Sequence, residues 1–142
     1  MTIPMARRQV LFDTCLWAQF FNRPQSREHE AISSLVKRNQ ACTIGPIIFE
    51  VLSGFKRKQH ADWVSSVLQC IPEIEMGWNA WRSAANWNRE LVSRGSRLPL
   101  ADLFSATIAL KNDLFIYSTD PHFRLSGASS SAGILHFSGS MK

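Results

Sequence analysis

Short apolar runs alternate along this chain with longer segments whose apolar residues recur every three or four positions. The runs are typical of strands buried on both faces, and the longer segments are typical of amphipathic helices. The predicted strands are Val10–Phe12, Ala41–Ile44, Leu114–Tyr117 and Ile134–Phe137, with 71–76 as a candidate edge strand. The predicted helices cover 14–21, a segment opened by Pro24 and Ser26, Pro46–Phe55, 60–70, Trp78–Arg94 with Gly95 as its stop, and a segment opened by Pro99. Strands separated by helices predict an α/β fold, a three-layer α/β/α sandwich with a mostly parallel central sheet.

The length and composition are those of one ordinary globular domain. The chain has 142 residues, of which 45% are hydrophobic and 19% charged, so we expect a single domain over 1–142 and exclude disordered, collagen-like and coiled-coil chains. No apolar run approaches the roughly 18 residues that a membrane span requires. The N-terminal segment lacks the pattern of a signal peptide. We therefore expect a soluble, cytoplasmic protein with no membrane partner.

The cysteines and histidines show no spacing typical of a metal site. Cys15, Cys42 and Cys70 form no CxxC or Cys/His cluster, and each has apolar sequence neighbours, so we expect reduced, buried thiols. The histidines are scattered at positions 29, 60, 122 and 136. We therefore expect no structural zinc.

Four acidic residues stand out by their positions. Asp13 and Asp120 directly follow predicted strands, with a threonine beside each, and ligands bind at the carboxyl ends of parallel strands. Glu50 lies within the apolar sequence IIFEVL, so we expect it to face the protein and to meet a positive partner, because an unpaired buried carboxylate is costly. Asp102 lies in the first turn of the helix that Pro99 opens.

Each acid also has a structural alternative. Asp102 could interact with the positive end of its helix dipole, and Asp13 and Asp120 could be turn residues that bond local backbone. Taken together, however, the four carboxylates are typical of a Mg²⁺ or Mn²⁺ site, because hard cations prefer oxygen ligands and would relieve the repulsion between the acids. No phosphate-binding loop, nucleophile elbow, zinc-protease or dinucleotide motif competes with this interpretation.

The order of four motifs resembles a PIN domain of the VapC type, the toxin half of a toxin–antitoxin pair. These motifs are VLFDTCLWAQFF, TIGPIIFEVLSG, RGSRLPLADLFSATIAL and LFIYSTDPHF, and they span residues 10 to 123. The matching residues are Asp13-Thr14, Glu50 with Gly54, Gly95, Pro99 and Asp102 with Ala106 and Ala109, and Ser118, Asp120 and Phe123. No single motif is specific, but their order and spacing are.

The resemblance implies a metal-dependent endoribonuclease that hydrolyses phosphodiester bonds of tRNA or other structured RNA. It implies that Mg²⁺ or Mn²⁺ is held by Asp13, Glu50, Asp102 and Asp120. Thr14 and Ser118 would lie beside these ligands or the metal. A small antitoxin protein and a second copy of the chain are the implied partners.

Two other function classes compete with the nuclease. A catalytically weak PIN-fold subunit would act mainly through protein or RNA binding, and the presence of all four acids argues against it. A phosphate-transfer receiver domain needs paired acids early in the chain, whereas residues 7–13 offer only one, which excludes that class.

Basic residues provide candidates for RNA contacts in a chain of net charge +5. Arg94 and Arg97 are favoured because their loop leads to Asp102, and the Lys56-Arg57-Lys58 run is the other candidate. The alternative is that both clusters are solvated helix ends, with Arg94 pairing with a helix C-terminus. The tryptophans of 78–87 recur at near-helical spacing, so we expect core or partner packing rather than base stacking.

Overall fold

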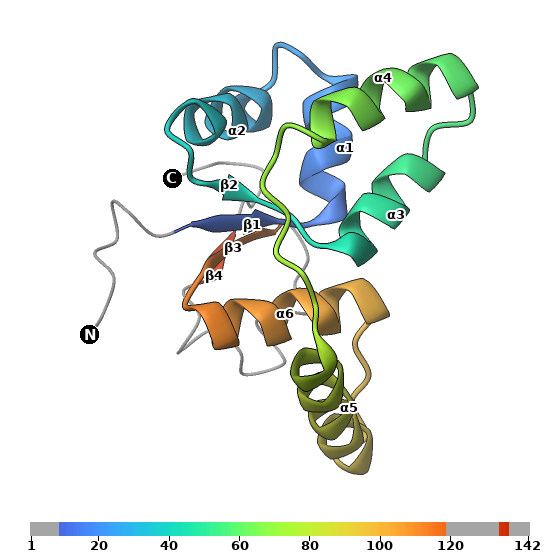
Figure 1. Cartoon of the computed structure of the whole chain (residues 1–142), viewed down its shortest axis with the longest axis vertical. Helices are drawn as coiled ribbons and strands as arrows, with labels where there is room; N and C mark the ends of the chain where they lie inside the picture. The colour runs from blue at the N-terminus through green and yellow to red at the C-terminus, as the bar shows by residue number, and fades with distance from the viewer. Residues whose placement is uncertain (1–8, 119–133, 137–142) are drawn as a thin grey trace.

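A parallel four-stranded sheet forms the centre of the molecule (Figure 1). The structure is a computed structural model, and it describes residues 9–118 and 134–136. The strand order is β2-β1-β3-β4, and every pair is parallel. The strands are β1 (Val10–Phe12), β2 (Ala41–Cys42), β3 (Phe115–Ser118) and β4 (Ile134–His136). In the centre of the sheet, Val10 pairs with both Ala41 and Phe115.

Helices cover both faces of this sheet. In Figure 1, α1, α2, α3 and α4 lie on one side and α5 and α6 on the other, which confirms the predicted three-layer fold class. The helices are α1 (Thr14–Asn22), α2 (Arg27–Lys37), α3 (Gly45–Ser53), α4 (Lys58–Leu68), α5 (Trp78–Ser93) and α6 (Leu100–Asn112). Their bounds agree closely with those predicted from the hydrophobic pattern.

Local signals in the sequence explain several of these helix ends. Ser26 is the N-cap of α2, and its Oγ accepts a hydrogen bond from the backbone N–H of His29 at 3.1 Å. Pro99 is the N-cap residue of α6. Gly95 ends α5 with a φ of +78°, a left-handed conformation that glycine adopts without strain.

The prediction of an edge strand over 71–76 is wrong. Of this segment only Glu73 forms an isolated parallel bridge, with Thr43, through hydrogen bonds on either side of it. Pro72 has no N–H to donate, and β2 is too short to template a longer strand because α3 begins at Gly45.

The main core lies between the sheet and the helices that begin at its carboxyl edge. Phe12 and Trp17 are fully buried and pack edge to face, with ring centroids 5.3 Å apart. This contact fixes the first turn of α1 against β1, so the backbone of Asp13 and Thr14 between them is held in place. A smaller cluster of Ala84, Leu91 and Leu103 joins α5 to α6.

The cysteine prediction holds for one residue of three. Cys42 is buried, and burial raises the pKa of its thiol to about 12. Cys15 and Cys70 are exposed, which corrects the expectation that they are buried. Apolar neighbours in sequence misled here because a helical residue and its sequence neighbours point in different directions. In the described part of the chain, no helix is long and apolar enough to span a membrane.

Candidate carboxylate site

Asp13 lies at the carboxyl end of β1 and joins two strands that are distant in sequence. It is the N-cap of α1, and its Oδ1 accepts a hydrogen bond from the backbone N–H of Leu16 at 3.1 Å. Its Oδ2 accepts a hydrogen bond from the Oγ of Ser118, the last residue of β3. Asp13 is 5% exposed and Ser118 is fully buried. Asp13 therefore does bond local backbone, as the structural alternative predicted, and it also bonds a side chain on another strand.

The position of this pair is the place where parallel sheets bind ligands. The chain leaves β1 for β2 on one side of the sheet, and leaves β3 for β4 on the other. The carboxyl ends of β1 and β3 therefore flank the point at which the direction of winding reverses, where a crevice opens between the helices. Asp13 and Ser118 meet at this point.

Glu50 reaches the same edge through Thr14. The Thr14 Oγ1 donates a hydrogen bond of 2.7 Å to Oε1 of Glu50, which links the start of α1 to the middle of α3. Glu50 is exposed, which corrects the expectation that it faces the interior, while the expectation of a positive partner stays a prediction. The buried face of α3 is formed by Ile47 and Val51, which turns residue 50 toward solvent although its sequence neighbours are apolar.

Asp102 lies in the first turn of α6 as predicted. The residue is partly buried, and its Oδ2 atom is fully buried. The preceding residue, Ala101, lines a groove together with Glu50, so the start of α6 faces α3. Its place in the first turn of α6 also allows the Asp102 carboxylate to interact favourably with the positive end of the helix dipole.

The fourth predicted acid, Asp120, lies outside the described residues. It follows the described Ser118 by two positions in the sequence. Within 9–118 and 134–136, no three His, Cys, Asp or Glu side chains are grouped closely enough to hold a metal ion. The carboxylate oxygens of Asp13, Glu50 and Asp102 are the donor type that Mg²⁺ prefers, but the described acids alone do not complete such a site.

An apolar groove borders the carboxylates, and sequence reasoning missed it. Its volume is about 470 Å³, and it lies between α3, α5 and α6. Its lining residues are Gly45, Pro46, Phe49, Glu50, Trp81, Leu100, Ala101 and Phe104. Phe49 is 71% exposed and Leu100 66% exposed, which is unusual for side chains of this size. The sequence did carry a signal for this groove: IIFEVL has more apolar residues than one buried helix face can hold, so some of them must lie on the surface.

The tryptophans of α5 divide between core and surface. Trp78 is 79% exposed, so core packing is wrong for this residue. Trp81 packs edge to face against Phe104, with centroids 5.0 Å apart, and borders the apolar groove. Trp87 is partly buried against the core. Partner packing at the exposed tryptophans stays a prediction.

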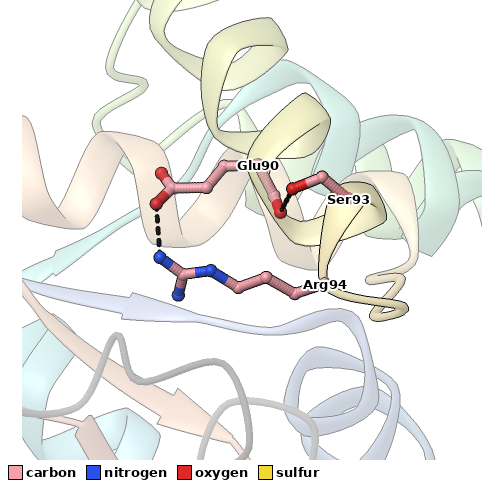
Figure 2. Close-up of polar contacts among 3 residues, drawn as sticks. All are labelled: Glu90, Ser93 and Arg94. Carbon is pink, nitrogen blue, oxygen red and sulfur yellow. Dashed lines mark hydrogen bonds and ion pairs between the residues drawn. The ribbon is translucent and has the colours of Figure 1, made fainter.

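Of the two favoured arginines, Arg94 has an ion-pair partner on its own helix. Figure 2 shows the Nη2 of Arg94 donating to Oε1 of Glu90 at 2.5 Å, and the Oγ of Ser93 donating to the Glu90 carbonyl at 2.7 Å. Both charged side chains are more than half exposed. This contact fits the alternative of a solvated helix end for Arg94. Arg97 is exposed in the loop between α5 and α6.

Comparison with known proteins identifies the fold. No family model matches the chain, and no curated protein sequence does. Among solved structures, VapBC2 from Rickettsia felis bound to promoter DNA aligns with a TM-score of 0.74 at 14% identity, covering 89% of this chain and 97% of that one. The chain has the fold of the VapC-type PIN-domain toxins.

Two further VapC-type structures agree over most of both chains. DNA-bound VapBC from Salmonella typhimurium has a TM-score of 0.72 at 15% identity and covers 91% of this chain and 98% of that one. Mycobacterium tuberculosis VapC20, a toxin that cleaves the sarcin–ricin loop, has a TM-score of 0.65 at 15% identity and covers 84% and 95%. The resemblance inferred from the motifs is thus confirmed at the level of the VapC fold.

Proposed function

We propose that this chain is a metal-dependent endoribonuclease and the toxin of a toxin–antitoxin pair. The observation that carries the proposal is the hydrogen-bonded arrangement at the carboxyl edge of the sheet. There, Ser118 holds the Asp13 carboxylate, and Thr14 holds that of Glu50. On a VapC-type fold, this arrangement brings carboxylates from separate elements to the point where a ligand is expected.

Mg²⁺ or Mn²⁺ is the proposed cofactor, with Asp13, Glu50, Asp102 and Asp120 as its ligands. When bound, such an ion would lower the pKa of a bound water and offset the negative charge of the scissile phosphate. The carboxylate donors suit a hard cation, and the completeness of the site depends on Asp120.

The chain's own residues have separate roles in this proposal. Ser118 and the N–H of Leu16 hold the two oxygens of Asp13 in a fixed orientation. Thr14 orients the exposed Glu50 carboxylate toward the same edge. None of these residues needs to act as a nucleophile.

The proposed substrate is tRNA or another structured RNA. VapC20, which shares the fold, cleaves the sarcin–ricin loop, and this chain has a net charge of +5 that favours a polyanion. Arg97 remains the favoured arginine for a phosphate contact, since Arg94 is engaged by Glu90.

The proposed protein partners are a small antitoxin and a second copy of the chain. Structures of this fold include toxin–antitoxin complexes, and the apolar groove offers exposed side chains that a protein partner would bury. We expect Phe49→Ser and Leu100→Ser to lower the mass of the purified protein in light scattering from dimer to monomer. A wild-type monomer at all concentrations would refute the homodimer.

The nuclease is tested by cleavage of labelled total tRNA, and separately of ribosomal RNA, with antitoxin-free protein. Reactions contain Mg²⁺, Mn²⁺ or EDTA, and compare wild type with Asp102→Asn. The matched control is Asp113→Asn, because Asp113 precedes β3 at the opposite edge of the sheet and asparagine also tolerates its φ of 54°. Asp102→Asn is cleaner than Asp13→Asn, because Asp13 also caps α1 and bonds Ser118.

Metal-dependent fragments that EDTA and Asp102→Asn abolish, and that Asp113→Asn retains, would establish the activity and its site together. If folded, metal-binding protein cleaves neither tRNA nor ribosomal RNA, the proposed activity is refuted. The chain would then be a PIN-fold subunit that acts through binding, the class that the apolar groove favours.

A further inference from the structure

The segment from Phe55 to Trp63 joins basic and aromatic side chains on one exposed surface. It connects the end of α3 to the first turns of α4, above the sheet in Figure 1. Lys56 and Arg57 are exposed, and neither forms an ion pair with a described residue. The next basic residue, Lys58, is offset by Asp62, with 3.0 Å between Nζ and Oδ2. Two positive charges therefore remain here without a counter-charge from the described part of the chain.

The aromatic rings of the same segment contact one another. The His60 ring stacks on that of Trp63, with centroids 5.7 Å apart, and meets Phe55 at 4.6 Å. Trp63 also contacts the buried Phe21 at 5.5 Å. These contacts hold the indole in one orientation, yet Trp63 remains 50% exposed. An exposed indole and unpaired basic side chains on one short segment are the combination that binds single-stranded nucleic acid.

The surface lies close to the carboxylate site along α3. Gly54, which follows the last residue of α3, donates its N–H to the carbonyl of Glu50 at 3.2 Å, one helical turn away. Gly54 therefore lies about 6 Å further along the helix axis than Glu50, and the basic pair begins two residues after Gly54. A strand of RNA whose phosphate lies at the carboxylates would pass this segment with its neighbouring nucleotides.

We infer that Trp63, with Lys56 and Arg57, binds an unpaired nucleotide that flanks the scissile phosphate. The inference rests on the proposed nuclease function and specifies its substrate as RNA that is single-stranded next to the cleaved bond. The indole stacks on the base, and the two cations contact the adjacent phosphates. Base stacking on a side chain requires an unstacked base, which a loop or bulge supplies and a regular duplex does not.

The test is direct binding in EDTA, where no cleavage occurs, followed by fluorescence anisotropy. The probes are a fluorescein-labelled single-stranded RNA oligonucleotide of mixed sequence and the same strand annealed to its complement. The variants are Trp63→Ala, Trp63→Phe and the double variant Lys56→Ala/Arg57→Ala. Lys111→Ala is the matched control, because this exposed lysine lies at the end of α6 near the opposite edge of the sheet.

Trp63→Ala is expected to weaken binding of the single strand by at least about 5-fold, the lower end of what one base–aromatic stack contributes. It should leave duplex binding nearly unchanged, and Trp63→Phe should retain most of the affinity. The double variant should weaken both probes, and for the single strand it should reduce the slope of log K against log salt by about 0.7 for each phosphate that is no longer neutralised. Lys111→Ala should bind as wild type.

Three outcomes distinguish a failure of this inference from a failure of the proposed function. If wild type binds and cleaves RNA but Trp63→Ala binds both probes as wild type, the inference alone is overturned. It is overturned equally if folded Trp63→Ala and Trp63→Phe lose single-strand and duplex binding to the same extent. If wild type neither binds nor cleaves any RNA, the proposed function fails, and the inference with it.

Discussion

Ser118→Ala removes a side-chain donor that reaches Asp13 from another strand. The Ser118 hydroxyl is fully buried, and the Asp13 carboxylate is 5% exposed, so water cannot easily replace this hydrogen bond in the variant. Hydrogen bonds to charged groups contribute roughly 1.5–3 kcal/mol to stability. We expect the free energy of unfolding to fall by about that amount, and RNA cleavage to fall with it as Asp13 loses its orientation.

The assay is urea unfolding followed by circular dichroism. Ser105→Ala is the matched control, because Ser105 is 1% exposed and its Oγ donates to a neutral carbonyl, that of Ala101, at 2.7 Å. This neutral bond lies within one helix, where alanine is the better helix former, so we expect a change of no more than about 1 kcal/mol. A double-mutant cycle with Asp13→Asn isolates the pairwise contribution of the Ser118 bond.

The reasoning is refuted if Ser118→Ala destabilises the protein no more than Ser105→Ala. It is refuted as well if Ser118→Ala lowers the free energy of unfolding by the same amount in the wild-type protein and in the Asp13→Asn variant. In either case the hydroxyl would fill space without stabilising the carboxylate.

Three further predictions follow from local geometry. Thr14→Val should leave the midpoint of urea unfolding nearly unchanged, because its bond to Glu50 is exposed, yet it should lower the rate of RNA cleavage at saturating substrate. Gly95→Ala should lower the unfolding free energy by roughly 1 kcal/mol in urea unfolding, because alanine is strained at its φ of +78°. A thiol reagent should modify the exposed Cys15 and Cys70 in the native protein and should reach Cys42 only after unfolding. Burial also raises the pKa of the Cys42 thiol from 9.0 to about 12, so this thiol ionises at lower pH in the unfolded state than in the native state. The free energy of unfolding should therefore fall as pH rises from about 9 toward 12.

The fold class and the order of the elements follow from the hydrophobic pattern of the chain. Buried parallel strands are short and apolar throughout, and the apolar residues of helices recur with a period of about 3.6. Each strand or helix can therefore be predicted from its own segment of sequence. The same holds for Asp13, whose place directly after an apolar strand already put it at the carboxyl edge. Capping residues such as Ser26 and Gly95 gave the helix ends because their effect is local.

By contrast, the face that each helix turns to the core, and the side chains that meet there, depend on how the whole chain packs. Glu50 has apolar sequence neighbours, yet α3 turns it to solvent, where Thr14 bonds it. Cys15 and Cys70 were misjudged for the same reason, and the apolar groove forms only when α3, α5 and α6 come together. The bond between Ser118 and Asp13 spans 105 positions, so no local pattern encodes it. Orientation depends on the packing of whole helices, which is a property of the assembled chain rather than of any segment.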